Sequence, residues 1–326
     1  MKSLAEKIKR AKTLILSTHK QCDGDGLGAE LALFHALKKI GKDVHVINVD
    51  ATPTKYSYLY GYPAIEIFLP QRKDPPAADL ALIFDTNDHR LLEPLYERLQ
   101  KSTKEIIFVD HHPLLADGPQ PTANSLIDIN AASTGEIAFR LIRELRVPLD
   151  EKIAQAIYTS VAFDTQIFRY VRNSPESHLM AAELLKFDIQ PEFIHQRLFG
   201  NQTPSKIAYL AKVLASIEYF EEGRLVALKI KESELESHGL DSDQTRDIVD
   251  MIMNIESVEI ALVFREDGPK DYKISLRSKG RFDVKLVAEA VGGGGHRYSA
   301  GAYVKGGYNE IREKLVDLLT RSLKAA

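Results

Sequence analysis

Acidic residues and histidines gather in four short segments of this 326-residue sequence. The segments are His19-Lys20-Gln21-Cys22-Asp23-Gly24-Asp25, Asp85-Thr86-Asn87-Asp88, Asp110-His111-His112 and Ala162-Phe163-Asp164-Thr165. Ionised carboxylates that converge in a buried place require a compensating charge, most simply divalent metal ions. Carboxylates mixed with imidazoles, without any thiolate, favour Mn²⁺ over Mg²⁺ or a structural zinc ion. The segments therefore predict a metal centre, with Mn²⁺ as the first choice.

The Asp23-Gly24-Asp25 pair indicates two ions side by side. Two carboxylates on a turn relaxed by glycine can face neighbouring ions, and His19 can complete the ligands of one. Metal ions about 3.5–4 Å apart can activate a shared hydroxide and stabilise phosphate oxygens during displacement at phosphorus, so the pattern favours phosphoester hydrolysis. Each element also has a simpler interpretation, because Asp-x-Asp pairs occur in ordinary turns and an exposed loop can carry two histidines without function.

Short strands and helices alternate around these segments. Apolar runs at 14–16, 44–49, 80–84 and 106–109 predict strands, and apolar residues at helical spacing from Leu27 to Leu37 predict a helix. This alternation is typical of an α/β fold with a parallel sheet and helices on both faces, which binds its ligands at the carboxyl edge of the strands. We therefore expect all four segments to follow strands and to meet at that edge.

The length of the chain is about twice that of a usual domain, which predicts two domains. A polar break, Glu221-Glu222-Gly223-Arg224, separates the first part of the chain from a second run of strands and helices. We expect a catalytic metal-binding domain over residues 1–203, a helical linker over 204–222 with one helix over 205–220, and a smaller α+β domain over 223–326.

Composition narrows the class of protein and its partners. With 44% apolar residues, 27% charged residues and a net charge of −3, the chain is typical of a globular protein without the basic excess of a long nucleic-acid binder. Its single cysteine, Cys22, allows no internal disulfide, and no apolar stretch is long enough to span a membrane. We expect a cytoplasmic protein that takes a substrate with few phosphates.

The four segments resemble the motifs of the DHH phosphoesterase family, which is named for the triplet that stands here as Asp110-His111-His112. The first family motif, His-x-x-x-Asp-x-Asp, is matched by His19, Asp23 and Asp25, the second by Asp85 and the fourth by Asp164. The run from Gly292 to His296, followed by Ala300-Gly301, is similar to the signature of the DHH-associated C-terminal domain. Length, motif order and this signature indicate the nano-RNase type.

The resemblance implies a role for each of these residues. The implied ligands are His19 and Asp23 for one Mn²⁺, Asp25, His111 and Asp164 for the other, and Asp85 for both. His112 would be catalytic: it would stabilise charge on the scissile phosphate or help to protonate the leaving oxygen. Asp110 would orient other residues through hydrogen bonds.

The same resemblance implies a homodimer that hydrolyses nano-RNA and dinucleotides to mononucleotides, and possesses phosphatase activity on 3′-phosphoadenosine 5′-phosphate. The expected substrate-binding residues are Arg277, Gly293, Gly294, Gly295 and His296. Successive glycines let backbone N–H groups approach an anion, and Arg277 and His296 add directional donors. The simpler interpretation is a turn that joins a helix to a strand.

Departures from the family pattern leave the substrate more open than the metal site. Many relatives have proline where this chain has Cys22, and alanine where it has Ser299. One alternative is a phosphodiesterase for cyclic dinucleotides or for pApA and pGpG, and another is a nucleotide sensor without catalysis. We expect Asp88 to cap a helix, Arg90 to lie on the surface, and no role for His35, His45, His89, His178, His195 or His238.

Overall fold

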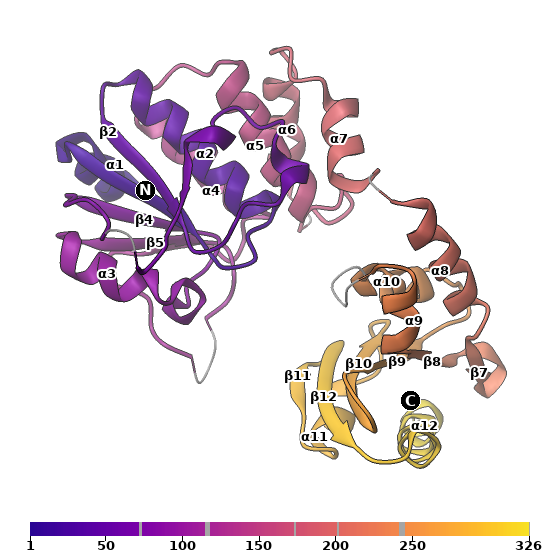
Figure 1. Ribbon diagram of the computed structural model, residues 1–326. Helices are drawn as coiled ribbons and strands as arrows, with labels where there is room; N and C mark the ends of the chain where they lie inside the picture. The colour runs from indigo at the N-terminus through magenta and orange to yellow at the C-terminus, as the bar shows by residue number, and fades with distance from the viewer. Residues whose placement is uncertain (72–73, 115–117, 173, 201, 241–244, 326) are drawn as a thin grey trace. The chain divides into compact units, whose positions relative to one another are not determined.

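The computed structural model describes residues 1–325 apart from 72–73, 115–117, 173, 201 and 241–244. The chain forms two compact units, Met1–Asn201 and Gln202–Ala326, and each has its own sheet (Figure 1). The sheet of the first unit has six strands in the order β3-β2-β1-β4-β5-β6, and all of its strand pairs are parallel. The predicted α/β fold with a parallel sheet is confirmed.

The elements of the first unit alternate as the sequence predicts. Its strands are β1 (Thr13–Thr18), β2 (Asp43–Asn48), β3 (Ile65–Ile67), β4 (Leu80–Phe84), β5 (Ile106–Asp110) and β6 (Leu126–Ile127). Its α-helices are α1 (Lys2–Arg10), α2 (Gly24–Lys39), α3 (Leu95–Ser102), α4 (Thr134–Glu144), α5 (Glu151–Asp164), α6 (Glu176–Leu184) and α7 (Pro191–Phe199). Short 3₁₀ turns are η1 (Thr54–Tyr56), η2 (Tyr62–Ala64) and η3 (His89–Leu92).

The strand order places a switch point between β1 and β4. From β1 the chain moves outward to β2 and β3, then returns to β4 on the other side of β1 and continues to β5 and β6. At such a point the connections diverge to opposite sides, which leaves a crevice at the carboxyl ends of the two central strands. The residues that follow β1 and β4 are His19 and Asp85.

Both faces of this sheet are covered. On one face Leu14, Leu16 and Phe84 pack with α1, α2, α4 and α5, and on the other Ile15 and Ile83 pack with α3. Alternate residues of each strand point to opposite faces, so a strand buried on both sides is apolar throughout, as the sequence pattern indicated. The rigid sheet therefore holds the loops at its carboxyl edge.

Side-chain caps begin the helices that carry the site. Asp23 accepts hydrogen bonds from the backbone of Asp25 at 2.9 Å and Gly26 at 3.4 Å, which starts α2. Ser133 caps α4 by accepting from the Glu136 N–H at 3.2 Å, and Asp150 caps α5. Each such cap contributes about 1 kcal/mol to helix stability. The chain therefore specifies where these three helices begin.

The second unit contains a mixed sheet in the order β11-β12-β10-β9-β8-β7, in which only β8 and β9 pair in parallel. Its strands are β7 (Glu218–Phe220), β8 (Leu225–Ile230), β9 (Ile260–Glu266), β10 (Asp271–Ser278), β11 (Gly294–His296) and β12 (Ser299–Lys305). Its helices are α8 (Pro204–Leu214), α9 (Glu232–Ser237), α10 (Arg246–Met253), α11 (Val284–Glu289) and α12 (Tyr308–Ala325), with the 3₁₀ turn η4 (Glu221–Gly223). Helices α8, α9 and α10 cover one face, and α11 and α12 the other.

The predicted helical linker differs from the structure in its second half. The helix α8 ends at Leu214, and residues 218–220 form the edge strand β7, which pairs with β8. Tyr209, Leu210 and Val213 of α8 are buried in the apolar cluster against β8 and β9. This helix is therefore part of the core of the second unit, because its apolar face is buried there. Helical periodicity alone does not reveal which unit buries that face.

Candidate active site

The predicted site residues of the first unit come together at the carboxyl edge of its sheet. His19 follows β1, Asp85 follows β4, and Asp110 is the last residue of β5, with His111 and His112 directly after it. Two of the four predicted positions differ in their local structure. The Asp23-Gly24-Asp25 segment is the start of helix α2 and not a relaxed turn, and Asp164 is the last residue of helix α5 and does not follow a strand.

Among the described residues the ligand-type atoms form three groups: one of Asp85, Asp110, His111 and His112, and two clusters that together contain the predicted metal ligands. One of these two clusters contains His19, Asp23 and Asp85, and the other contains Asp25, His111 and Asp164, with the atoms of each cluster within 4.8 Å of one another. In the first cluster the Nε2 atom of His19 lies 3.5 Å from Asp85 Oδ2 and 3.9 Å from Asp23 Oδ2. In the second, His111 Nε2 lies 3.5 Å from both Asp25 Oδ2 and Asp164 Oδ2.

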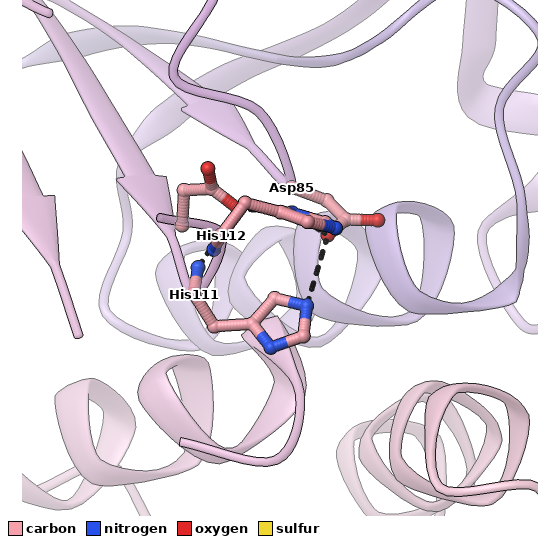
Figure 2. Close-up of side chains that lie close together, drawn as sticks. Asp85, His111 and His112 are labelled. Atoms are coloured by element: carbon pink, nitrogen blue, oxygen red, sulfur yellow. Dashed lines mark hydrogen bonds and ion pairs between the residues drawn. The ribbon is translucent and has the colours of Figure 1, made fainter. Parts of the chain in front are cut away.

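Asp85 joins the two clusters. Its Oδ2 atom faces His19, while its Oδ1 atom lies 3.7 Å from His111 Nε2 and 3.6 Å from His112 Nδ1. Figure 2 shows Asp85 beside both histidines, with one dashed line to the His111 ring. The backbone of Asp85 has φ 61°, in the left-handed region that non-glycine residues adopt rarely. Such local strain is found where a structure positions a side chain for function.

The surroundings of His111 suit a metal cation. Its Nδ1 atom lies 3.2 Å from the carbonyl oxygen of Ala131 and donates to it, which leaves a lone pair on the buried Nε2. Among the described residues this Nε2 has no hydrogen-bond partner, although carboxylate oxygens of Asp25, Asp85 and Asp164 surround it. A lone pair that faces three carboxylates is repulsive without a positive charge between them, so the donor set fits a divalent metal ion.

Burial and mutual repulsion raise the pKa values of these carboxyl groups. Burial raises the pKa of Asp25, and burial followed by the charges of Asp25 and Asp23 raises the pKa of Asp85 well above its usual range. The same causes raise the pKa of Asp164 to about 7. Burial lowers the pKa of His111, which keeps the ring neutral, as a metal ligand must be.

Residues that the motifs do not include hold Asp25 in place. Its carboxylate accepts hydrogen bonds from the backbone N–H groups of Thr134 at 2.8 Å and Gly135 at 3.1 Å, and from the Ser160 hydroxyl. The Thr134 hydroxyl also donates to Asp85 Oδ1 at 3.0 Å. Ser133 and Glu136 have the spacing of a capping box, a local signal for the start of α4, but no signal in the sequence indicates that this start faces a carboxylate more than 100 residues away.

Asp110 orients His112. The Oδ1 atom of this fully buried carboxylate accepts from His112 Nδ1 at 2.9 Å and from the backbone N–H groups of His111 at 2.8 Å and His112 at 3.2 Å. Its Oδ2 atom accepts from Asn87 Nδ2 at 2.7 Å. The hydrogen bond to Asp110 raises the pKa of His112, whose side chain is 55% exposed. His112 is therefore an accessible imidazole that retains a proton more readily than usual.

Glycines let the site helices approach closely. A Cβ atom added to Gly26 would overlap Thr18 of β1, and one added to Gly28 would overlap the backbone of Ala156 in α5. A Cβ on Gly24 would lie 2.8 Å from Cβ of Phe163, the neighbour of Asp164. The glycines beside Asp23 and Asp25 therefore allow α2 to pack on α5, which brings Asp25 and Asp164 together.

Two residues near the site have structural roles. Asp88 caps η3 by accepting from the Arg90 N–H at 2.9 Å, and its carboxylate pairs with the Arg90 guanidinium at 2.6 Å. Burial raises the pKa of the Cys22 thiol to about 12, so this cysteine stays protonated and packs in the core. The predicted cap at Asp88 is confirmed.

The second unit brings Arg277 and the glycine cluster to one cavity. This cavity of about 700 Å³ lies on the face of β9, β10 and β12 beneath α10, and Arg277, Gly293, Gly294 and Gly295 line it. The side chain of His296 lies outside the described part of the structure. Lys273 and Arg265, which the sequence motifs did not indicate, line the same cavity. One acidic residue, Asp250, also lines the cavity, which thus offers three cations and backbone groups to an anion beside one carboxylate.

The glycines differ in what they permit. A Cβ on Gly293 would overlap the backbone oxygen of Gly301 and lie 2.5 Å from Cβ of Ala302, so this glycine permits close packing of backbone on backbone. Gly292 and Gly295 have φ values of 80° and 140°, which glycine adopts without strain. Gly294 has nothing within 4 Å of a built Cβ, which leaves open space beside its backbone.

The fold and the site define a hydrolase of the DHH phosphoesterase class, and the family comparisons agree. Residues 13–161 match the family model described as DHH family, N-terminal domain, and residues 222–325 match the DHHA1 domain. The chain belongs to the DHH family and carries its associated C-terminal domain.

Among curated relatives, the chain is 30% identical to the bifunctional oligoribonuclease and PAP phosphatase NrnA of Thermus thermophilus, over 99% of this chain and 95% of the relative. It is 23% identical to the NrnA protein of Bacillus subtilis, with 94% of each chain covered. An exopolyphosphatase-related protein from Bacteroides fragilis has the same fold, with a TM-score of 0.83, 24% identity and coverage of 99% and 95%. No described helix combines the length and apolar character needed to cross a membrane.

Proposed function

We propose that the protein is a two-metal hydrolase that cleaves very short oligoribonucleotides to mononucleotides and removes a phosphate from 3′-phosphoadenosine 5′-phosphate. The observation that carries this proposal is the pair of carboxylate and imidazole clusters joined by Asp85. The names of the Thermus and Bacillus relatives support the two substrate classes.

The proposed ligands are His19 and Asp23 for one ion, Asp25, His111 and Asp164 for the other, and Asp85 for both. When bound, such ions stabilise phosphate oxygens as Lewis acids and lower the pKa of water. We propose Mn²⁺, since a set of carboxylates and imidazoles without thiolate suits it. Hydrogen bonds from Thr134, Gly135 and Ser160 keep the Asp25 carboxylate fixed for this role.

His112 is the proposed catalytic residue. Because its Nδ1 atom is held by Asp110, the Nε2–H of the protonated ring is available to a phosphate oxygen or to the leaving oxygen. Its exposure gives substrate access to the ring, and its raised pKa favours the form that can donate. Asp110 acts through His112 and is a positioning residue.

The cavity of the second unit is the proposed binding place for the nucleotide. Arg277 can donate two parallel hydrogen bonds to a phosphate, and the open backbone at Gly294 can approach one closely. His296 is retained as a substrate-binding residue on the family signature. Together these groups would confine the enzyme to small nucleotides.

A substrate panel tests the function. The pure protein is assayed with Mn²⁺, Mg²⁺ or EDTA on an RNA dinucleotide, 3′-phosphoadenosine 5′-phosphate, linear pGpG and pApA, a cyclic dinucleotide and long single-stranded DNA. We expect Mn²⁺-dependent turnover of the first two, with little on long DNA. Because specificity is a ratio of kcat/KM values, a higher value for a cyclic dinucleotide or for pGpG would establish the alternative substrate class.

Failure of every substrate with Mn²⁺ would refute the proposal and favour a nucleotide sensor. The homodimer and the cytoplasmic location expected from the sequence stay predictions. Size-exclusion chromatography with light scattering would test the first.

A further inference from the structure

One cavity of the N-terminal unit is lined by positively charged residues, which suit a phosphate and not a metal ion. It has a volume of about 660 Å³, within the range of small-molecule sites. It lies between η1 and α7, which are in contact. The residues that line it are Thr54, Lys55, Ser57, Phe193, Gln196, Arg197 and Gly200. This described lining contains two cations and no acidic residue, although the whole chain has a net charge of −3.

Arg197 is held at this cavity with part of its hydrogen-bonding capacity unused. Its Nη2 atom reaches Ser57 Oγ at 3.3 Å and the Thr54 carbonyl oxygen at 3.5 Å, both long contacts. Its Nε atom is buried without a hydrogen-bond partner among the described residues. A guanidinium that is only partly satisfied can donate further hydrogen bonds to an anion.

Aromatic rings border the same cations. The guanidinium of Arg197 lies 6.0 Å from the ring centre of Phe193 and 5.9 Å from that of Tyr58. Phe193 is 42% exposed, although it is a large apolar residue. An exposed aromatic face beside cations is the combination with which proteins bind a base and its phosphate.

Phe163 connects this cavity to the carboxylate clusters. The Nζ atom of Lys55 lies 5.8 Å above its ring, and the ring stacks on Phe199, which precedes Gly200 of the cavity lining. Phe163 also lies against Gly24, between Asp23 and Asp25, and it directly precedes Asp164. The cavity and the proposed metal ligands are therefore neighbours within one unit.

We propose that this cavity, the Lys55–Arg197 pocket, binds one nucleotide unit, with the phosphate at Lys55 and Arg197 and the base against Phe193. This proposal rests on the proposed function. The occupant is a nucleotide of an RNA chain that extends beyond the dinucleotide bound at the active site. A free mononucleotide has the same chemistry and is the second possible source. The pocket gives the enzyme a contact that distinguishes three nucleotides from two.

Binding without turnover tests the pocket. Fluorescence anisotropy in EDTA measures the Kd of a labelled RNA trinucleotide and a labelled dinucleotide for the wild type and for Lys55→Gln/Arg197→Gln. We expect the Kd of the trinucleotide to rise about tenfold, because hydrogen bonds from two cations to a phosphate are lost. The slope of log K against log salt should become less negative by about 0.7 for the one phosphate released.

The matched control is Lys38→Gln/Arg143→Gln. Each of its two cations also lies over an aromatic ring, Phe34 for Lys38 and Phe139 for Arg143, but neither lines the pocket. Lys55→Gln alone and Phe193→Leu give the same test if loss of Arg197 impairs folding, which circular dichroism detects. Calorimetry with AMP distinguishes the sources: an effect on the trinucleotide alone indicates the RNA chain, and an equal effect on AMP indicates a free nucleotide.

Equal Kd values for the pocket variants and the control, or no binding of either ligand by the wild type, would overturn the inference. The proposed function has a separate readout. If the wild type binds the trinucleotide through the pocket but cleaves nothing with Mn²⁺, the function fails and the pocket stands.

Discussion

The two units handle charge in opposite ways. The carboxyl edge of the first sheet gathers acidic groups and neutral imidazoles, and its protein donors mainly position those groups. The cavity of the second unit gathers Arg277, Lys273 and glycine backbone around open space, with Asp250 also in its lining. The first arrangement gathers negative charge that cations would balance, whereas the second has more cations than carboxylates in its lining. The donor set of the first unit therefore fits metal ions, and the cavity of the second unit fits an anion.

The carboxylate site of the first unit and the cavity of the second unit also differ in the contacts that keep them rigid. Side-chain hydrogen bonds fix the acidic groups: Asp25 accepts from two helix N–H groups and a serine, and Asp110 from three donors of the His111–His112 segment and from Asn87. In the second unit, close packing of backbone at Gly293 and Gly301 shapes the cavity. Substitutions in the two places should consequently fail in different ways.

The largest effect is expected from Asp85→Asn, which removes the charge shared by the two clusters. Turnover of an RNA dinucleotide with Mn²⁺ should fall about 10³-fold or more, roughly 4 kcal/mol of transition-state stabilisation. Asn tolerates the left-handed backbone and can still accept from Thr134, so the fold should persist. In EDTA the variant should melt no lower than the wild type, because a repelled buried carboxylate is gone. Retained turnover would show that the clusters do not act as one site.

Arg277→Ala tests whether the second cavity binds substrate without taking part in chemistry. We expect KM for the dinucleotide to rise about tenfold, with kcat changed less than about threefold, since a contact made equally in ground state and transition state is lost. Arg281→Ala is the control, because Arg281 is exposed and does not line the cavity. A fall in kcat at constant KM would instead place Arg277 in the catalytic machinery.

Gly293 and Gly294 are neighbours, but only Gly293 is packed closely against other backbone. Gly293→Ala should lower the free energy of unfolding by about 1–3 kcal/mol, because its Cβ overlaps the backbone of Gly301. Gly294→Ala should change stability by less than about 0.5 kcal/mol, since open space surrounds that position. Urea unfolding measures both. Equal destabilisation by the two variants would contradict the structural distinction between them.

Another effect concerns the stability of the metal-free protein at different pH values. The pKa of Asp164 is about 7 in the folded state against 3.8 as its ordinary value, so the folded protein binds the proton more tightly. The unfolding free energy in EDTA should therefore fall as pH rises from about 4 to about 7. Asp164→Asn should remove this part of the fall, and Mn²⁺ should reduce it. Parallel urea titrations of the two proteins would show no such difference if the Asp164 carboxyl group were neither buried nor near other carboxylates.

Much of the site could be predicted because strand ends are a local property. Apolar runs locate β1, β4 and β5, and in a parallel sheet their carboxyl ends share one edge, so His19, Asp85 and the Asp110–His112 segment had to lie near one another. Asp23 and Asp25 follow His19 closely in the sequence, so two more carboxylates could be expected at the same edge. Residue type and chain position were sufficient for these.

Other features depend on packing between distant helices. Asp164 reaches the site from the end of α5 only because the glycines of α2 permit close approach, and Thr134 and Ser160 reach Asp25 through the same contact. The pocket between η1 and α7 joins residues more than 130 positions apart. Periodicity and spacing describe a segment and its neighbours in the chain, whereas such contacts arise from the way buried surfaces fit together. The chemistry of the individual residues could thus be predicted from the sequence, whereas the tertiary fold determined which of them lie together.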